Sequence, residues 1–435
     1  MALLGDLRFG SFFFAKTFSL AGLWSHNVVA AVLAYQITGS VFYVGLVSVA
    51  QFGPQLLFMG ASGVVADRGD KRGQIVLGRL ICAAGSTTLA VWCLVDTGGD
   101  SPATRVMILV ASLVLGIGLV LGGPALMAFV PALVREDEIP TAVRLDALPM
   151  LVGRSAGPAL GALLVTWAGP GPALFAAAGP NLVFAAVVTM IRVDPPASHG
   201  SDADGSMRAA LRHVRQDRRL MLILFGVVVI GVAADPALTL APAIAAGTGG
   251  GARTVGVFAS AFGIGAALGV VLMGPLERWI AGSQVVVAGL CVLGTSTGVL
   301  AVPLPVPVLI GAFAFAGAGM STALTSLTAL LQVAVPDSLR GRVMSMWLAC
   351  FVGARPIAAL LNGTISDVLS VPAALVFATA LVAVTARVCR PSRLRVPSPE
   401  QREGKSAVQK DCAPLAHAED PGQGLRPRPG TTNPR

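Results

Sequence analysis

The stretch Gly63-Val-Val-Ala-Asp67-Arg68-Gly-Asp-Lys71-Arg72 places five charged side chains within positions 67–72, between two long apolar runs. The runs extend over about residues 43–65 and 74–95. Crossing the hydrocarbon core of a bilayer, roughly 30 Å thick, takes about 20 helical residues, and each run has that length. The stretch is therefore predicted to be a tight polar turn at a membrane surface, joining two transmembrane helices.

The same alternation of apolar runs and short polar connectors continues along the whole chain of 435 residues. Hydrophobic residues make up 54% and charged residues 12%, whereas a soluble domain carries about 25% charged residues. Lipid must therefore replace water over most of the surface. We predict an all-α membrane protein of twelve transmembrane helices, expected near residues 12–37, 43–65, 74–95, 105–128, 145–166, 173–191, 220–243, 254–275, 283–301, 306–331, 343–365 and 371–388.

The basic residues predict how these helices are oriented. The odd-numbered connectors and their margins hold only Arg105 and Arg253. The even-numbered connectors hold Arg68, Lys71, Arg72, Arg135, Arg144, Arg192, Arg208, Arg212, Arg215, Arg218, Arg219, Arg278, Arg340 and Arg342. Basic connectors stay cytoplasmic, so both termini are predicted to be cytoplasmic. The net charge of +9 is thus interpreted as a signal of topology and not of nucleic-acid binding.

The longest internal connector, residues 193–219, divides the chain into two sets of six spans. We predict an N-terminal half over residues 1–192 and a C-terminal half over 220–390, followed by a disordered cytoplasmic tail over 391–435. The second part of the connector spaces Met207, Leu211, Val214 and Leu220 as a short amphipathic basic helix. Such a helix is expected to lie along the inner leaflet of a bacterial cell (inner) membrane.

A weak internal repeat supports the division into halves. At an offset of 200, Asp137, Val143 and Gly153 match Asp337, Val343 and Gly353. At an offset of 211, Val44-Gly45 matches Val255-Gly256. Both offsets pair one span with the span six places later, as a duplicated, pseudo-symmetric six-helix unit requires.

The opening stretch resembles GxxxDRxGRR, the signature loop of the major facilitator superfamily, with Asp70 where the family usually has Gly. The resemblance implies a gating loop of Gly63, Asp67, Arg68, Lys71 and Arg72. In the family, the carboxylate at the position of Asp67 lies near the N-terminal end of span eleven and helps to hold the cytoplasmic side closed. A topogenic charged turn is the alternative interpretation.

A second stretch, Gly153-Arg-Ser-Ala-Gly157-Pro158-Ala-Leu-Gly161-Ala162 in span five, resembles GxxxGPxxGG of the drug/proton antiporters in that superfamily. Three glycines four residues apart form a smooth stripe for close helix contact, and Pro158 bends the helix. Generic packing of small residues is the alternative. The antiporter interpretation implies export.

Two further segments resemble the branch that contains siderophore exporters and macrolide-efflux-like proteins. They are Val335-Pro-Asp-Ser-Leu-Arg340-Gly-Arg342-Val and Leu211-Arg-His-Val-Arg-Gln-Asp-Arg-Arg-Leu220. Together with Tyr35-Gln-Ile-Thr-Gly-Ser40, they extend the resemblance over roughly residues 10–390. It implies the major facilitator fold.

Charged residues inside the apolar runs are candidates for a substrate and proton site, because a charge at bilayer depth needs a partner or a role. At 1.5 Å per residue, Arg154 in span five and Arg355 in span eleven lie near mid-depth. A cavity with two arginines suits an anionic or zwitterionic substrate, and structural ion pairs are the alternative.

Two titratable residues are candidates for proton coupling. Asp235 lies towards the outer side of span seven, just before Pro236, and the protonation of such a carboxyl depends on burial and on nearby charges. A kink residue that faces outer water is the alternative. His26 in span one reaches a similar depth; the alternative for it is a hydrogen bond between helices.

The sequence contains no enzyme signature, and its six cysteines have no metal-ligand or CxxC spacing. No metal and no cofactor are therefore expected. We predict a monomeric secondary transporter that exports a small organic molecule, such as a drug, siderophore or secondary metabolite, against protons by alternating access. The alternatives are a uniporter or importer, a lysophospholipid flippase-like transporter, and a membrane sensor or assembly partner that does not transport.

Overall fold

A computed structural model describes residues 2–68, 70–96, 101–191 and 207–394, leaving out a few side chains, among them those of residues 59–68. The described residues form α-helices and two short 3₁₀ helices, η1 (Val130–Leu133) and η2 (Glu136–Glu138), with no strand among them. Eleven helical segments in this part of the chain are long and apolar enough to cross a membrane.

These long helices fall into two groups along the chain. The first group consists of α2 (Leu7–Thr38), α3 (Val41–Arg68), α4 (Lys71–Val95), α5 (Pro102–Phe129), α7 (Leu148–Ala168) and α8 (Pro170–Met190). The second consists of α13 (Ala252–Glu277), α14 (Gly282–Leu300), α15 (Val306–Ala334), α16 (Asp337–Val368) and α17 (Val371–Val388).

The predicted seventh span, residues 220–243, is not one continuous helix. It consists of α10 (Arg218–Ala234), α11 (Pro236–Thr239) and α12 (Ala241–Gly247). The breaks occur at Pro236 and Pro242, because a proline has no N–H to bond the carbonyl four residues back. Every described side chain from residue 231 to residue 245 is buried. With this broken helix the predicted all-α membrane fold of twelve spans is confirmed.

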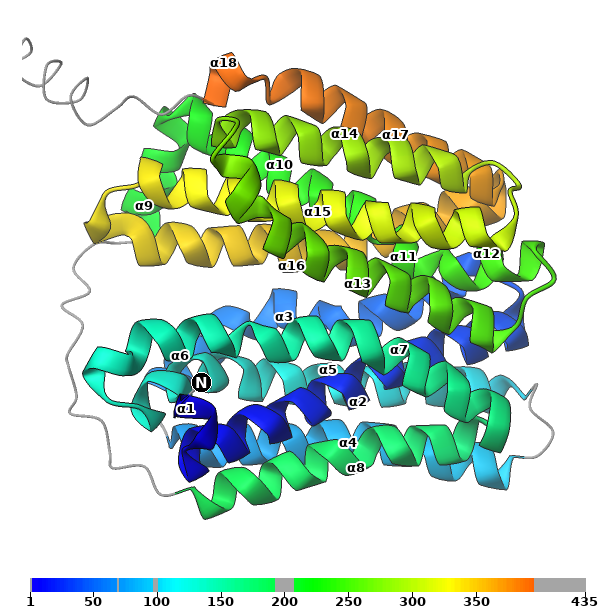
Figure 1. The fold of residues 1–435 in the computed structure, drawn as a ribbon. Coiled ribbons are helices and arrows are strands. Elements are labelled where there is room, and N and C mark those ends of the chain that lie inside the picture. The colour runs from blue at the N-terminus through cyan, green and yellow to red at the C-terminus, as the bar shows by residue number, and fades with distance from the viewer. Residues whose placement is uncertain (1, 69, 97–100, 192–206, 395–435) are drawn as a thin grey trace, which may run out of the picture. The chain divides into compact units, whose positions relative to one another are not determined.

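The described helices of residues 2–394 pack as one compact unit. In Figure 1, the first six spans lie below and the second six above. The two sets meet mainly along two helix pairs, α7 with α13 and α3 with α16. Each pair joins one helix of the first set to one helix of the second, so both sets form the boundary between them.

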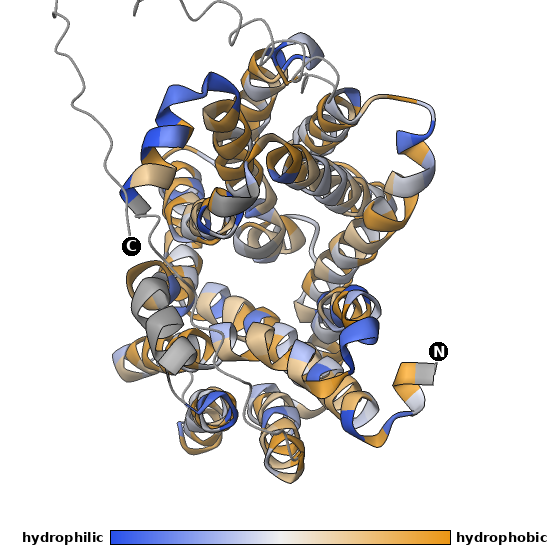
Figure 2. Cartoon of the chain, turned by 90° about the vertical axis from the view of Figure 1, so that its left-hand side faces the viewer, coloured by the Kyte–Doolittle hydropathy of each residue, from blue (hydrophilic) through white to orange (hydrophobic). Residues whose placement is uncertain are grey.

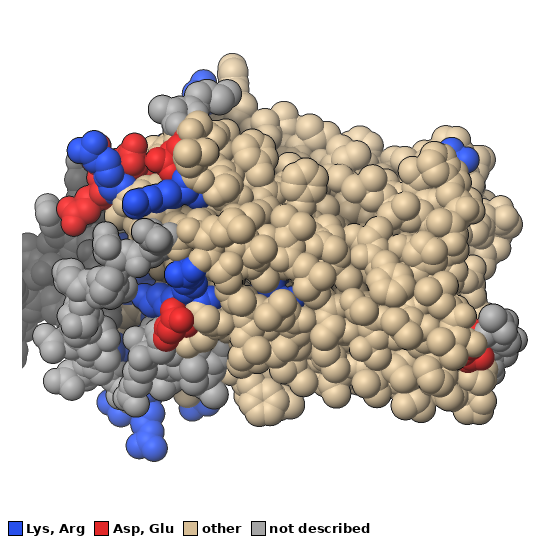
Figure 3. Space-filling model, turned by 90° about the horizontal axis from the view of Figure 1, so that it is seen from below, with Lys and Arg blue, Asp and Glu red and all other residues tan. Residues whose placement is uncertain are grey.

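The two ends of the helices differ in polarity. The short helices α1 (Ala2–Gly5), α6 (Ile139–Asp146), α9 (Met207–Gln216) and α18 (Pro391–Leu394) lie at one end, here called the linker end, opposite the far end (Figure 1). On the face shown in Figure 3, charged side chains gather at the linker end, and a broad band beside them is almost free of charge. Figure 2 looks onto the linker end and shows many apolar residues, in orange, among the helices. The band is therefore the surface that lipid would cover.

The short helix α9 lies inside the connector predicted over residues 193–219. Its Ala210 and Val214 are buried against α10 and α16, while Arg212 and Arg215 are not buried. The first part of that connector, and the predicted tail beyond residue 394, lie outside the described residues.

Candidate functional site

A small, partly open cavity lies between the two sets of helices. Both sets contribute to its wall. Its lining residues are Trp24, Val28, Arg154 and Pro158 from the first set, and Ala234, Ala237, Ala259, Phe262 and Arg355 from the second. A mostly apolar wall with a few polar groups is typical of a small-molecule site, and here the polar groups are the two arginines predicted from the sequence.

The glycine stripe of α7 positions one side of the cavity. A methyl group on Gly157 would lie 2.5 Å from the carbonyl oxygen of Ala21 on α2, and methyl groups on Gly153 and Gly161 would meet Leu20 and Ser25. Only glycine allows α7 to approach α2 this closely. The close approach brings Arg154 next to Trp24 of α2, while Pro158 faces the cavity.

The two arginines lie over aromatic rings, and they share one of them. The guanidinium carbon of Arg154 is 5.1 Å from the centre of the Trp24 ring and 4.8 Å from that of Phe262. The guanidinium carbon of Arg355 is 5.7 Å from the Trp24 ring and 4.9 Å from the ring of Phe52. Cation–π contacts of this kind stabilise a desolvated guanidinium by about 1–2 kcal/mol.

Aromatic contact does not neutralise the two charges. Among the described residues, neither arginine has a carboxylate oxygen within 4.0 Å. Within the described residues, Arg154 donates one weak hydrogen bond, of 3.9 Å to the Met320 sulfur, and the two guanidinium groups repel each other. The cavity therefore holds an excess of positive charge in a site of low dielectric, where an anionic group would be bound strongly.

Asp235 lies behind the cavity wall, at the break between α10 and α11. Asp235 as a whole is only 5% exposed, and its carboxyl group accepts a hydrogen bond of 3.0 Å from the side-chain amide of Asn362 on α16. Its neighbours Ala234 and Ala237 line the cavity, and Arg355 is close enough to attract it electrostatically. The helix break thus places a carboxyl group beside one of the two arginines.

His26 takes no part in the cavity wall. It lies on α2 and is fully buried, and its Nδ1 is 3.0 Å from the Ser86 hydroxyl on α4. The structure therefore separates His26 from Asp235, Arg154 and Arg355, with which it was grouped from the sequence.

The signature loop lies at the linker end, where α3 ends at Arg68 and α4 begins at Lys71. The side chains of Gly63, Asp67 and Arg68 lie outside the described residues, so their contacts are not part of this site. Asp70, the departure from the family pattern, is the N-cap of α4 and accepts a hydrogen bond of 3.0 Å from the Arg72 N–H. An Asp at this position stabilises the start of the helix.

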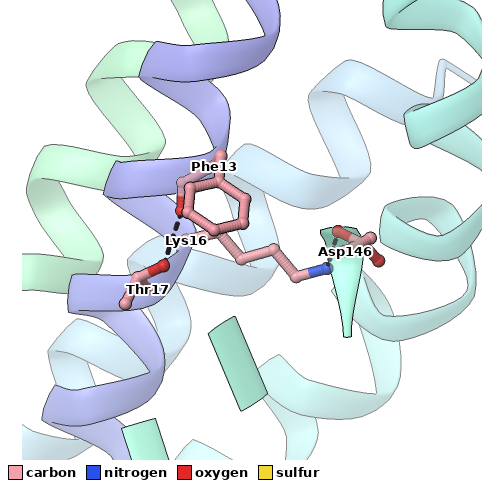
Figure 4. A network of polar contacts seen from close by, with 4 residues as sticks. All are labelled: Phe13, Lys16, Thr17 and Asp146. Carbon is pink, nitrogen blue, oxygen red and sulfur yellow. Dashed lines mark hydrogen bonds and ion pairs between the residues drawn. The ribbon is translucent and has the colours of Figure 1, made fainter. Parts of the chain in front are cut away.

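A polar network inside the first set was not predicted. Lys16 is buried and forms an ion pair of 2.5 Å with Asp146 at the end of α6 (Figure 4). Arg79 of α4 is buried as well and donates a hydrogen bond of 3.2 Å to the Ser19 hydroxyl, which itself donates to Asn181 at 2.8 Å. The sequence contains a signal for this network, because Arg79 is a charged residue inside an apolar run.

Comparisons with known proteins agree with this architecture. The sequence pattern of a family described as transmembrane secretion effector matches residues 1–424. The enterobactin exporters EntS of Salmonella typhi and Citrobacter koseri are 27% and 28% identical to the chain over 360 and 363 residues. In both cases the match covers 82% of this chain and 84% of the relative.

Solved structures share the fold at low sequence identity. A bacterial homologue of the human lysosomal transporter Spinster, in an inward-facing and unoccupied conformation, matches 89% of the chain and 97% of its own length, with a TM-score of 0.71 at 13% identity. A bacterial homologue of the iron transporter ferroportin matches 87% and 98%, with a TM-score of 0.65 at 16% identity. At such identities the likeness concerns the fold alone.

Proposed function

The chain belongs to the transmembrane secretion effector family of the major facilitator superfamily, and from this premise we propose that it is a proton-coupled exporter of a small organic molecule. The predicted family resemblance is confirmed, and so is the prediction of a membrane transporter that is not an enzyme. Similarity to enterobactin exporters supports efflux. Coupling to protons, the class of substrate and the sidedness are our proposals.

One observation supports the substrate class above all others: Arg154 and Arg355 lie over the Trp24 ring, and among the described residues neither has a carboxylate oxygen within 4.0 Å. The substrate is proposed to carry an anionic group that binds between these guanidiniums, one from each half. Its aromatic or apolar body would lie against Trp24 and Phe262. Because each half supplies one arginine, the bound anion would draw the two halves together.

Asp235 is the proposed proton carrier, and its place beside Arg355 determines which substrates can be exchanged for protons. A pure anion would bind better when Asp235 is protonated, because Arg355 would then be free, so the anion and the proton would travel together. Exchange requires that the substrate and the proton compete for the same group. A substrate that also presents a cationic or hydrogen-bond-donating group to the Asp235 carboxylate meets this requirement. We therefore favour a zwitterionic substrate, or an anion that carries such donors.

Alternating access is the proposed mechanism, with the two sets of helices rocking about the cavity. The loop of Gly63, Asp67, Arg68, Lys71 and Arg72 is proposed to hold the linker end closed when the far end is open. The stripe of Gly153, Gly157 and Gly161 keeps α7 on α2 during the movement, so that Arg154 and Trp24 move as one body.

The linker end is proposed to face the cytoplasm of a bacterial cell, with both termini on that side. The charged side chains gathered there support this orientation, because basic connectors remain on the cytoplasmic side (Figure 3). Export then means release at the far end. We propose that a single copy of the chain is sufficient, since one chain supplies both halves of the cavity.

Accumulation of enterobactin, the compound named for the relatives, provides a first test of export. Cells that express the protein should retain less enterobactin than cells that express the double variant Arg154→Gln with Arg355→Gln. Arg253→Gln is the matched control, because Arg253 is an exposed arginine on α13 outside the cavity. Greater accumulation in cells expressing the unaltered protein would contradict export, and equal activity of the double variant would contradict the assignment of the site.

A further inference from the structure

Asp367, at the far end of α16, caps a helix of the other half. Its carboxylate accepts hydrogen bonds from the backbone N–H groups of Val41 at 2.9 Å and Phe42 at 3.2 Å, and also from the Ser40 hydroxyl. Val41 and Phe42 are the first two residues of α3. A helix N-terminus leaves such N–H groups without partners and attracts negative charge, so a carboxylate is favoured at this place.

Gly39 and Ser40 form the turn that places the start of α3 next to Asp367. Gly39, with a φ of 63°, ends α2 in the left-handed conformation, and Ser40 turns the chain directly into α3. The Ser40 side chain accepts a hydrogen bond of 3.1 Å from the Tyr43 N–H, as an N-cap does, and donates to Asp367. The cap of α3 is thus shared between the two halves.

Close backbone packing continues below the cap. A methyl group on Gly45 would lie 2.5 Å from the Ala359 carbonyl oxygen, and one on Gly363 would lie 2.6 Å from the Phe42 Cα atom. The α3 and α16 backbones therefore touch at the far end, and they cannot separate there without breaking the hydrogen bonds to Asp367.

The other main helix pair between the halves, α7 with α13, has no carboxylate of this kind at the far end. The α7 sequence contains no Asp or Glu, and the only one in α13 is Glu277 at its linker end. At the far end these helices meet through Gly256, where a methyl group would clash with the Ala162 side chain. Of the two main helix pairs between the halves, only α3 with α16 thus has a polar contact of this kind at the far end in the described part of the chain.

We infer that Asp367 is a further functional residue of the transport cycle: it latches the far end shut by capping α3 across the boundary between the halves. The latch must open each time the cavity becomes accessible from the far end. This role goes beyond the proposed function, because it concerns the closure of the cavity and not the molecule that binds there.

Labelling of a cavity cysteine tests the latch without any substrate. In a full-length protein whose six native cysteines are replaced, Ala237→Cys places a thiol in the cavity wall. A membrane-impermeant maleimide, applied in turn to intact cells and to inside-out vesicles, reports access from each side. Asp367→Ala should make labelling from the far side about tenfold faster, which corresponds to ~1.4 kcal/mol in the opening equilibrium. Labelling from the linker side should fall or stay the same.

Asp96→Ala is the matched control. Asp96 accepts hydrogen bonds from Ser101 and Thr104, so it joins α4 to α5 within one half. It should leave the labelling rate unchanged. Equal rates in the Asp367→Ala variant and the unaltered background, or equal acceleration by Asp96→Ala, would overturn the latch.

A reversible cross-link provides a second test of the latch, in case the Asp367→Ala variant folds poorly. Ser40→Cys combined with Asp367→Cys should form a disulfide under oxidation that abolishes far-side labelling of Ala237→Cys, and a reductant should restore it. The pair Asp96→Cys with Thr104→Cys, cross-linked within one half, should leave labelling as it was. Undiminished labelling in the cross-linked Ser40–Asp367 pair would show that the far end opens elsewhere. Neither readout depends on export, so failure of the proposed function leaves this test intact.

Discussion

Arg154 and Arg355, one from each half of the molecule, hold their guanidinium groups over the same indole ring, that of Trp24, at 5.1 and 5.7 Å. The repeat in the sequence relates the spans that carry them, but it does not indicate that they share a partner. Trp24 belongs to α2, which the glycine stripe of α7 holds in place. The position of the Trp24 ring, and with it the contact to both arginines, therefore depends on how α2 packs against α7.

Replacing one arginine should weaken substrate binding more than it weakens the fold. Arg355→Gln removes a charge that has no carboxylate partner within 4.0 Å among the described residues, so folding should change little. A charge-assisted hydrogen bond contributes about 1.5–3 kcal/mol, so the KM for an anionic substrate should rise roughly 10- to 100-fold. Transport kinetics in proteoliposomes would measure this change.

Arg355→Lys provides the control for charge alone. Lysine keeps the positive charge but loses the planar fork and the stacking on Phe52 and Trp24. An intermediate KM is expected. A KM equal to that of the unaltered protein in both variants would show that the substrate does not contact this residue.

Substrate affinity should depend on pH with a sign that identifies the coupling. If substrate and proton compete for Asp235, affinity rises with pH, by at most about tenfold per pH unit for one proton exchanged. If a pure anion binds together with the proton, affinity falls as pH rises. Binding measured by calorimetry between pH 5 and 9 would distinguish the two cases, and Asp235→Asn should make the affinity independent of pH in this range.

The glycine stripe of α7 should tolerate no side chain. Gly157→Ala would place a methyl group 2.5 Å from the Ala21 carbonyl oxygen, and such overpacking costs about 1–3 kcal/mol. Gly179→Ala in α8 is the matched control, because a methyl group there meets no atom within 4 Å. Thermal unfolding in detergent should show a lowered Tm for the first variant only. A Tm unchanged by Gly157→Ala would mean that α7 and α2 can move apart without cost.

The ion pair of buried Lys16 and half-buried Asp146 should behave as a unit. Lys16→Met leaves the Asp146 carboxylate without its counterion, and Asp146→Asn leaves the buried ammonium group alone (Figure 4). Each single variant should lose about 1–3 kcal/mol of stability, whereas the double variant should lose less than the sum. Unfolding measurements on all four proteins form the double-mutant cycle, and strictly additive losses would contradict a coupled pair.

Much of this architecture could be predicted from the sequence, because hydrocarbon thickness and the cost of buried charge are strong constraints. Arg154, Arg355 and Asp235 were found by one rule, that a charge inside an apolar run needs a reason. The same rule applied to Arg79 would have found the polar network inside the first set. Trp24 could not be found in this way, since an aromatic residue in an apolar run gives no signal.

Two features could not be predicted from the sequence: the surroundings of Asp235 at the break in the seventh span, and the cap on α3. Pro236 and Pro242 indicate a disturbed helix, but only the packing shows that the break places Asp235 beside Asn362 and Arg355. Asp367 lies just outside the predicted span 343–365, where a polar residue is expected at a membrane surface. Its hydrogen bonds join residues more than 300 positions apart, a relationship that no local pattern contains.

We propose that the cavity between the halves exchanges an organic substrate for protons through Asp235. The most direct measurement is proton flux in proteoliposomes that hold a pH-sensitive dye, with enterobactin added on one side. The unaltered protein should move protons only when substrate is present and in the direction opposite to it, whereas Asp235→Asn should abolish the substrate-dependent flux and Asp96→Asn should leave it intact. Substrate movement by the unaltered protein without any proton flux, or an undiminished flux in Asp235→Asn, would contradict proton exchange through Asp235.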